Sequence, residues 1–207
     1  MAHALAPGSA PEWSAFTAAC GACTRCGLSS GRQQVVIGRG HPQARLMLIG
    51  EAPGATEDGQ GEPFVGRSGQ LLDQLLVESG LDPSRDVYLC NVVKCRPPDN
   101  RKPRAGELVA CRPWLDQQIA WVDPPLIGLL GATAVAAVLG LKSGMTQLRG
   151  HWLAGEGPLL SGRLLMPIFH PSYLLRNPSP AEGKPKWLTR EDLRSAVTRL
   201  RQLPASL

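Results

Sequence analysis

The sequence has no apolar run long enough to cross a bilayer. Its most apolar stretch, residues 126–141, falls short of the roughly 20 residues that a span requires and contains three glycines. The first dozen residues are small, polar and broken by prolines, without the basic start and apolar run of a secretory signal. We therefore expect no membrane segment, no export and a cytoplasmic location.

A strong charge excess is also absent, since the net charge is only +5. The distribution of charge is more informative. Residues 94–104 carry five cations against one acid, Asp99, among prolines that discourage a regular helix. This basic loop is either a solvated loop or a surface for a polyanion, and its composition alone leaves both interpretations open.

Six cysteines are present, and a cytosolic chain keeps them reduced unless a metal binds them. Cys23 and Cys26 form a C-x2-C pair, and fifteen residues separate Cys95 from Cys111. Four thiolates so spaced suit zinc or a 4Fe-4S cluster, and the spacing does not choose between them. Cys20 overlaps the first pair as an alternative ligand, whereas Cys90 falls inside an expected strand as a small buried residue.

Short apolar runs alternate with helical periodicity, which is typical of a parallel sheet covered by helices on both faces. The length suits one domain over residues 1–207, with residues 1–19 peripheral. Pro167 suggests an irregular or edge position for the last strand. Gly80 is placed to end the first helix and Thr189 to cap the last one. We expect an α/β, three-layer α/β/α sandwich with four parallel strands at 45–50, 87–91, 126–131 and 163–169, and helices at 68–80, 104–120, 132–139 and after 189.

Three of these strands end at or directly before a polar residue: Glu51, Asn91 and His170. Ligands of open parallel sheets bind beyond the carboxyl ends of the strands, so these side chains are expected to share one pocket. Singly, Asn91 also fits a turn residue and His170 a structural hydrogen-bonding residue. In the Gly-rich loop after Glu51, Phe64 is either a stacking platform for a ligand or an anchor packed on the core.

The segments 50–72, 91–103 and 170–176 resemble the three signature segments of family 4 uracil-DNA glycosylases, and the CTRC of 23–26 is similar to the first pair of cluster cysteines in that family. The resemblance implies a monomeric base-excision repair hydrolase with a four-stranded parallel sheet. Such an enzyme flips uracil out of single- and double-stranded DNA, cleaves its N-glycosidic bond, releases free uracil and leaves an abasic site. It would be cytoplasmic and associated with the nucleoid through DNA.

The resemblance also implies roles for site residues. Phe64 would stack on the uracil, Asn91 would bind its polar edge and His170 would donate toward its O2 atom. The backbone of Glu51 and Ala52 would contact the base, and Glu57 would exclude the methyl group of thymine at the C5 edge. Arg176, with Leu174 and Leu175, would enter the minor groove, unless the two leucines simply pack inward.

During cleavage of the N-glycosidic bond the sugar becomes cationic, and a carboxylate is expected to stabilise it or to orient the attacking water. The best-known sister family uses an Asp at the position of Ala52, so that mechanism does not apply here. Glu51 is the preferred carboxylate and Asp58 the second choice.

The resemblance favours a 4Fe-4S cluster over zinc. The family pattern Cys-Thr-x-Cys-x-Leu matches residues 23–28, so it leaves Cys20 out of the ligand set. The cluster would pin the basic loop for DNA binding. The expected ligands are Cys23, Cys26, Cys95 and Cys111.

Two other functions fit part of the sequence pattern. A related class traps uracil-DNA covalently through a histidine after the second motif, but this chain has no histidine between Asn91 and His151. A ferredoxin-like electron carrier would explain the cysteines and leave the other motifs without a purpose.

Overall fold

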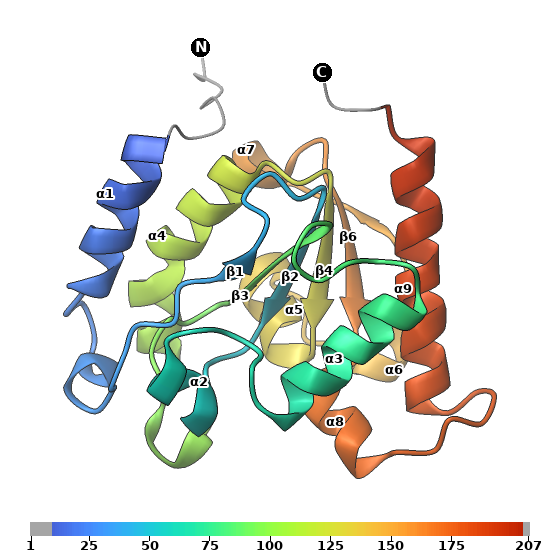
Figure 1. The fold of residues 1–207 in the computed structure, drawn as a ribbon, viewed down its shortest axis with the longest axis horizontal. Coiled ribbons are helices and arrows are strands. Elements are labelled where there is room, and N and C mark those ends of the chain that lie inside the picture. The colour runs from blue at the N-terminus through green and yellow to red at the C-terminus, as the bar shows by residue number, and fades with distance from the viewer. Residues whose placement is uncertain (1–9, 205–207) are drawn as a thin grey trace.

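The computed structural model describes residues 10–204, and one sheet with the strand order β1-β3-β2-β4-β6-β5 runs through them. Helices cover both faces of this sheet (Figure 1). The central strands are mutually parallel and agree with the expected ones to within a residue at either end. The three-layer α/β class is therefore confirmed. These central strands are β2 (Leu46–Gly50), β3 (Val87–Asn91), β4 (Leu126–Leu130) and β6 (Leu164–Ile168).

Two short antiparallel strands, β1 (Arg39–Gly40) and β5 (Leu153–Ala154), flank the parallel core and were not expected. Two residues are too few for a periodic pattern to show. Strand β6 therefore pairs on both sides, contrary to the edge position suggested by Pro167. However, β5 pairs only with Leu164 and Leu165, so the sheet has ended on that side before it reaches the proline.

Consecutive residues of each central strand face opposite layers. In β2, Leu46 and Leu48 pack in one core with residues of α3 and α9, whereas Met47 and Ile49 pack in a second core with residues of α4 and α5. This period of two explains why the strands are apolar throughout. The helices are α1 (Ala10–Gly21), α2 (Ala55–Gln60), α3 (Arg67–Glu78), α4 (Ala105–Val122), α5 (Ala132–Leu139), α6 (Met145–Leu148), α7 (Gly157–Leu160), α8 (Pro171–Arg176) and α9 (Pro185–Gln202), with 3-10 helices η1 (Gly27–Ser30) and η2 (Pro98–Asn100).

The described part of the expected peripheral segment 1–19 is not peripheral. Helix α1 runs alongside α4 (Figure 1) and buries Phe16, which packs in a third apolar cluster with Trp114 of α4 and with Cys20. Residues 1–9 lie outside the described part of the chain. The aromatic content, low overall, is concentrated at this contact.

One helix ends at the residue predicted from the sequence, and another begins earlier than predicted. Gly80 follows α3 with a φ of +89°, as expected of a residue that ends a helix. Thr189 does not cap α9, which begins at Pro185; its hydroxyl donates to the Pro185 carbonyl inside the helix. Proline at the first helical position starts this helix earlier than its apolar periodicity suggests.

Strands β2, β4 and β6 run toward the end of the molecule where α2 and α8 lie (Figure 1). The loops after the parallel strands therefore meet at this end. Within the described residues, no helix combines the length and apolar character needed to cross a membrane.

Candidate active site

The residues that follow strands β2, β3 and β6 line one cavity of about 250 Å³, which we call the base cavity. All but one of the expected substrate-binding residues line it: Glu51, Ala52, Glu57, Phe64, Asn91 and His170. The exception is Arg176, which lines an adjoining hollow of about 520 Å³ that we call the groove. Glu51 and His170 line both hollows. The fold thus places the expected catalytic residues together.

Asn91 is buried at the end of β3, and its Oδ1 atom has no hydrogen-bond partner among the described residues. Leaving such an acceptor without a donor costs about 1–3 kcal/mol. Gly50 on the neighbouring strand provides the space around it, because a Cβ at that position would lie 2.5 Å from both Asn91 Oδ1 and Phe64 Cζ. The base cavity therefore presents an acceptor that lacks a donor.

Phe64 directs its ring from the Gly-rich loop to the base cavity. Its φ of 57° lies in the left-handed region, which non-glycine residues adopt uncommonly. The Arg39 guanidinium, which also pairs with Asp73, supports this turn by donating to the Pro63 and Phe64 carbonyls at 2.7 and 3.1 Å. The ring is 5% exposed, and its centroid lies 6.4 Å from that of His170. Phe64 therefore both anchors its loop and lines the cavity.

His170 caps α8 and keeps its Nδ1 atom occupied. The backbone N–H of Ser172 donates to Nδ1 at 3.1 Å, and the Ser172 hydroxyl lies 2.8 Å from the same nitrogen. Burial, with the positive charge of Arg176 as a smaller cause, lowers the pKa of His170 from 6.5 to about 4. The ring is therefore neutral at neutral pH, and because Nδ1 accepts, its proton is on Nε2.

The carboxylate of Glu51 accepts a hydrogen bond from the hydroxyl of Thr133 in the first turn of α5. Thr133 was not among the expected site residues. A signal was present, because Thr133 lies in the first turn of the helix that follows β4, at the same edge of the sheet as the other candidates, and β4 is the neighbour of β2. Thr133 orients the carboxylate where the base cavity and the groove meet.

The two acids of α2 have different surroundings. Glu57 lines the base cavity, and its two oxygens accept from the backbone N–H groups of Gly54 at 3.1 Å and Gly66 at 2.8 Å. Glu57 therefore holds two parts of the Gly-rich loop together through hydrogen bonds. Asp58, the second choice for the catalytic carboxylate, accepts instead from the backbone N–H groups of Gln33 and Gln34 and does not line the base cavity.

The basic loop presents fewer free cations than its composition suggests. Lys94 is 1% exposed and so does not contribute to the loop surface. Arg101 pairs with Glu107 at 2.6 Å, and its hydrogen bond is the main cause that lowers the pKa of Glu107 to about 2. Asn100 and Arg101 line the base cavity; they lie in the signature segment 91–103, but neither was expected as a site residue. Lys102 lines the groove.

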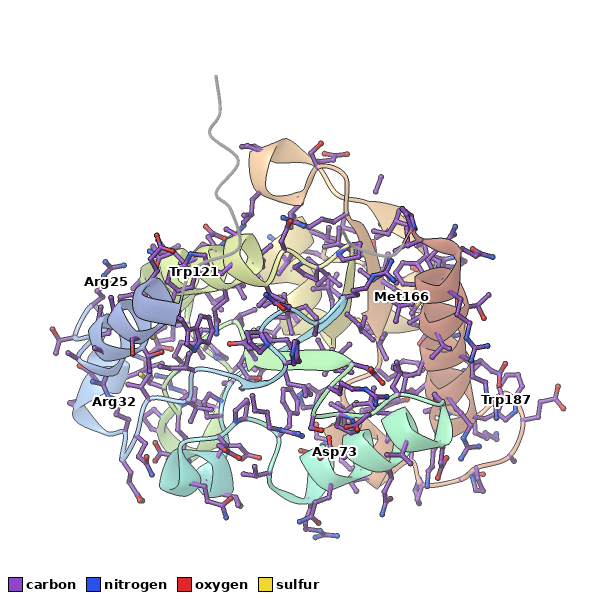
Figure 2. The ribbon with its side chains drawn as sticks, turned by 45° about the horizontal axis from the view of Figure 1, so that its top comes forward. Arg25, Arg32, Asp73, Trp121, Met166 and Trp187 are labelled. Atoms are coloured by element: carbon purple, nitrogen blue, oxygen red, sulfur yellow. The ribbon has the colours of Figure 1, made fainter. Side chains whose placement is uncertain are left out.

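The expected metal-binding cysteines come together between α1, η1 and α4, where they line one small cavity with Cys20. Three of their sulfur atoms accept hydrogen bonds. Trp114 Nε1 donates to Cys23 at 3.2 Å, Arg32 to Cys95 at 3.4 Å, and the backbone N–H that precedes Cys95 donates to Cys111 at 3.3 Å. Arg25 and Arg32 lie on the same side of the molecule as α1 (Figure 2). The hydrogen bonds from Arg32 and from the Lys94 backbone favour the charged sulfur of Cys95 and Cys111, but burial has the larger effect and raises the pKa of both thiols.

The donor set fits a group bound by four thiolates. Within residues 10–204, no three side chains of metal-ligating types are placed to hold a single ion. Burial raises the pKa of Cys20 to about 12, as it raises that of Cys111 to about 11. Unlike Cys111, Cys20 accepts no hydrogen bond from a described residue. Cys90 is fully buried in β3, as expected of a small apolar residue.

The expected minor-groove segment is the helix α8. Leu174 is fully buried in the core, whereas Leu175 is 38% exposed. Neighbouring helical residues point about 100° apart, so both leucines cannot face the same way. The expectation of two inserted leucines is therefore wrong for Leu174.

The family model of the uracil DNA glycosylase superfamily matches residues 37–194, which contain the four central strands and the whole base cavity. The chain belongs to this superfamily. Within the superfamily, the chain is similar to several type-4 uracil-DNA glycosylases. The type-4 uracil-DNA glycosylase of Thermotoga maritima is 48% identical over 158 residues, which cover 76% of this chain and 80% of the relative. That of Saccharolobus solfataricus is 36% identical over 191 residues, covering 89% and 85%. A third, from Sulfurisphaera tokodaii, is 39% identical over 165 residues, covering 76% and 73%.

Proposed function

We propose that this member of the uracil-DNA glycosylase superfamily flips uracil out of DNA into the base cavity, hydrolyses the N-glycosidic bond, releases free uracil and leaves an abasic site. The observation that carries the proposal is the unpartnered Oδ1 of Asn91 in the same cavity as the neutral His170. We place the enzyme with its DNA in the cytoplasm, as a monomer.

Asn91 suits the polar edge of uracil. The N3–H group of uracil can donate to Asn91 Oδ1, and the amide NH2 of Asn91 can donate to O4 of the base. Cytosine carries no hydrogen on N3 and would leave the buried oxygen without a donor. That loss disfavours the normal base, as expected for a site built to hydrogen-bond its substrate.

Cleavage leaves a uracil anion beside a sugar with cationic character, so the two sites of charge need opposite partners. His170 donates from Nε2 toward O2 of the departing base. Glu51, oriented by Thr133, lies where the base cavity and the groove meet. Its carboxylate stabilises the cationic sugar and orients the attacking water. Phe64 lies against the face of the base.

The groove suits the DNA strand next to the extruded nucleotide. Lys102 and Arg176 line it and provide positive charge for phosphates. Leu175, exposed on α8, would fill the gap that the base leaves in the stack. Both single- and double-stranded DNA are substrates in this proposal.

We assign Cys23, Cys26, Cys95 and Cys111 to a 4Fe-4S cluster. Hydrolysis of an N-glycosidic bond transfers no electrons, so a cluster held by these four cysteines would act structurally, by linking the start of η1, the basic loop and α4. Cys95 lies four residues after Asn91. The link therefore supports both the DNA-binding surface and the end of β3.

The proposal is tested by product analysis on oligonucleotides that contain one uracil, single- or double-stranded, with thymine-containing strands as matched controls. We expect free uracil and an alkali-labile abasic site. A stable protein–DNA adduct would indicate covalent trapping instead. An absence of both products with iron-replete protein would refute the proposal.

Iron content is expected to separate the cysteines into two groups. Alanine at Cys20 or Cys90 should leave iron and sulfide at the wild-type level, because neither is assigned as a ligand. Alanine at any of the four assigned ligands should abolish the visible absorbance and lower the melting temperature. Iron lost in Cys20→Ala but kept in Cys26→Ala would show that the first C-x2-C pair is the ligand pair.

Glu57 is expected to guard the C5 edge of the base while holding its loop. Glu57→Gln keeps the side-chain volume but loses one acceptor for the loop, so thymine should stay excluded while uracil release slows. Glu57→Ala opens the cavity, and the ratio of uracil to thymine cleavage should fall. If Glu57→Ala abolishes uracil release and still gives no thymine cleavage, Glu57 acts through its loop and not through steric exclusion.

A further inference from the structure

Lys94 is a buried cation without an anionic partner among the described residues. It is 1% exposed, and none of their ion pairs includes it. Removing an unpaired ammonium from water costs several kcal/mol. The fold keeps it buried in spite of this cost, so a compensating negative group is expected nearby.

The surroundings of Lys94 indicate where that group lies. Lys94 lines the cysteine cavity, and its backbone N–H donates to Cys111. The compensating negative group is therefore expected in the cysteine cavity.

Lys94 also contacts the base-binding residue. Its Nζ atom donates to the backbone carbonyl of Asn91 at 2.6 Å. The intervening turn is held to β2 and its extension, because Val92 and Val93 donate to the carbonyls of Gly50 and Glu51 at 2.9 and 3.3 Å. One side chain therefore bridges the cysteine cavity and the strand end that carries Asn91.

We infer that Lys94 is the counter-ion of the metal group held by the four cysteines and that, through the Asn91 carbonyl, it positions the base-binding asparagine. Four thiolates outweigh the positive charge of the metal core that they bind, so the loaded site carries net negative charge beside the ammonium. The inference rests on the proposed cluster. It makes Lys94 a positioning residue, since it does not line the base cavity.

A thermodynamic cycle between Lys94 and the cluster tests the charge relationship. Melting temperatures are compared for wild type and Lys94→Met, each with the cluster and after its removal by oxidant and chelator. In the loaded protein the cation is compensated, so wild type should melt higher. In the stripped protein the wild type keeps an uncompensated buried charge, so Lys94→Met should melt at least as high. Equal destabilisation in both states would show that Lys94 acts only through its hydrogen bond, and would overturn the inference.

The reduction potential of the cluster is a second measurement that does not depend on catalysis. Loss of the positive charge should make the cluster harder to reduce in Lys94→Met, whereas Lys94→Arg should stay near the wild-type potential. The exposed Lys142→Met removes the same charge elsewhere and should change neither iron content nor potential. Should Lys94→Met fail to fold, Lys94→Gln serves in its place; full iron and an unchanged potential in that variant would also overturn the inference.

The link to Asn91 is measured by single-turnover uracil release at saturating DNA. We expect a loss of roughly tenfold in Lys94→Met, the size typical when a partner of a metal ligand shell is removed, with recovery in Lys94→Arg. A wild-type rate in iron-replete Lys94→Met would contradict the positioning role. Wild-type protein that carries no metal when purified anaerobically would refute the proposed cluster itself, which is a separate outcome.

Discussion

Replacement of His170 by alanine is expected to slow uracil release by roughly 100-fold or more, the loss found when one preorganised donor to a developing anion is removed. Binding of uracil-containing DNA should change much less, because the hydrogen bond from His170 stabilises the base most as the base departs with negative charge. Single-turnover rates and equilibrium binding of the same oligonucleotide measure the two effects. Equal losses in both would make His170 a binding residue.

The protonation state of His170 gives this prediction a pH signature. The pKa is lowered from 6.5 to about 4, so the neutral ring persists well into the acid range. If the neutral ring is the active donor, His170 should cause no inflection in the cleavage rate near pH 6.5, and activity should fall only as the pH approaches about 4. A rate that rises on acidification through pH 6.5 would instead indicate a charged imidazolium as the active form.

Replacement of Asn91 by alanine is expected to slow uracil release by a similar factor, roughly 100-fold, because both hydrogen bonds to the polar edge of the base disappear. Its effect on stability should be unusual for a buried residue. Alanine removes the acceptor that lacks a donor in the free protein, so the melting temperature should not fall. Cleavage rates and melting curves of one protein preparation test both statements.

A second Asn91 variant separates recognition from packing. Asn91→Asp replaces the amide donor with an acceptor, which opposes O4 of uracil and suits the 4-amino group of cytosine. The ratio of uracil to cytosine cleavage should therefore fall relative to wild type. A lower rate on uracil with no change in that ratio would show that Asn91 shapes the cavity without reading the base.

Sequence patterns identified the central sheet and most of the candidate site. Continuous apolar runs marked the four parallel strands, and the ends of parallel strands necessarily share one edge of a sheet. Glu51, Asn91 and His170 could therefore be grouped before any coordinates were known. The cysteines were harder, since two overlapping C-x2-C pairs are equivalent on spacing alone.

The tertiary structure decided which partner each polar side chain meets. Nothing local distinguishes Lys94 from Lys102 in the basic loop, yet one is buried against Asn91 and the other lines the groove. Thr133 reaches Glu51 although 82 positions separate them, and Glu57 bonds to two parts of a loop that folds around it. Periodicity reports only which face of a helix or strand is apolar, over a few residues. Burial and pairing of a charge depend on elements distant in the chain, so they become determined only when the sheet, helices and loops pack together.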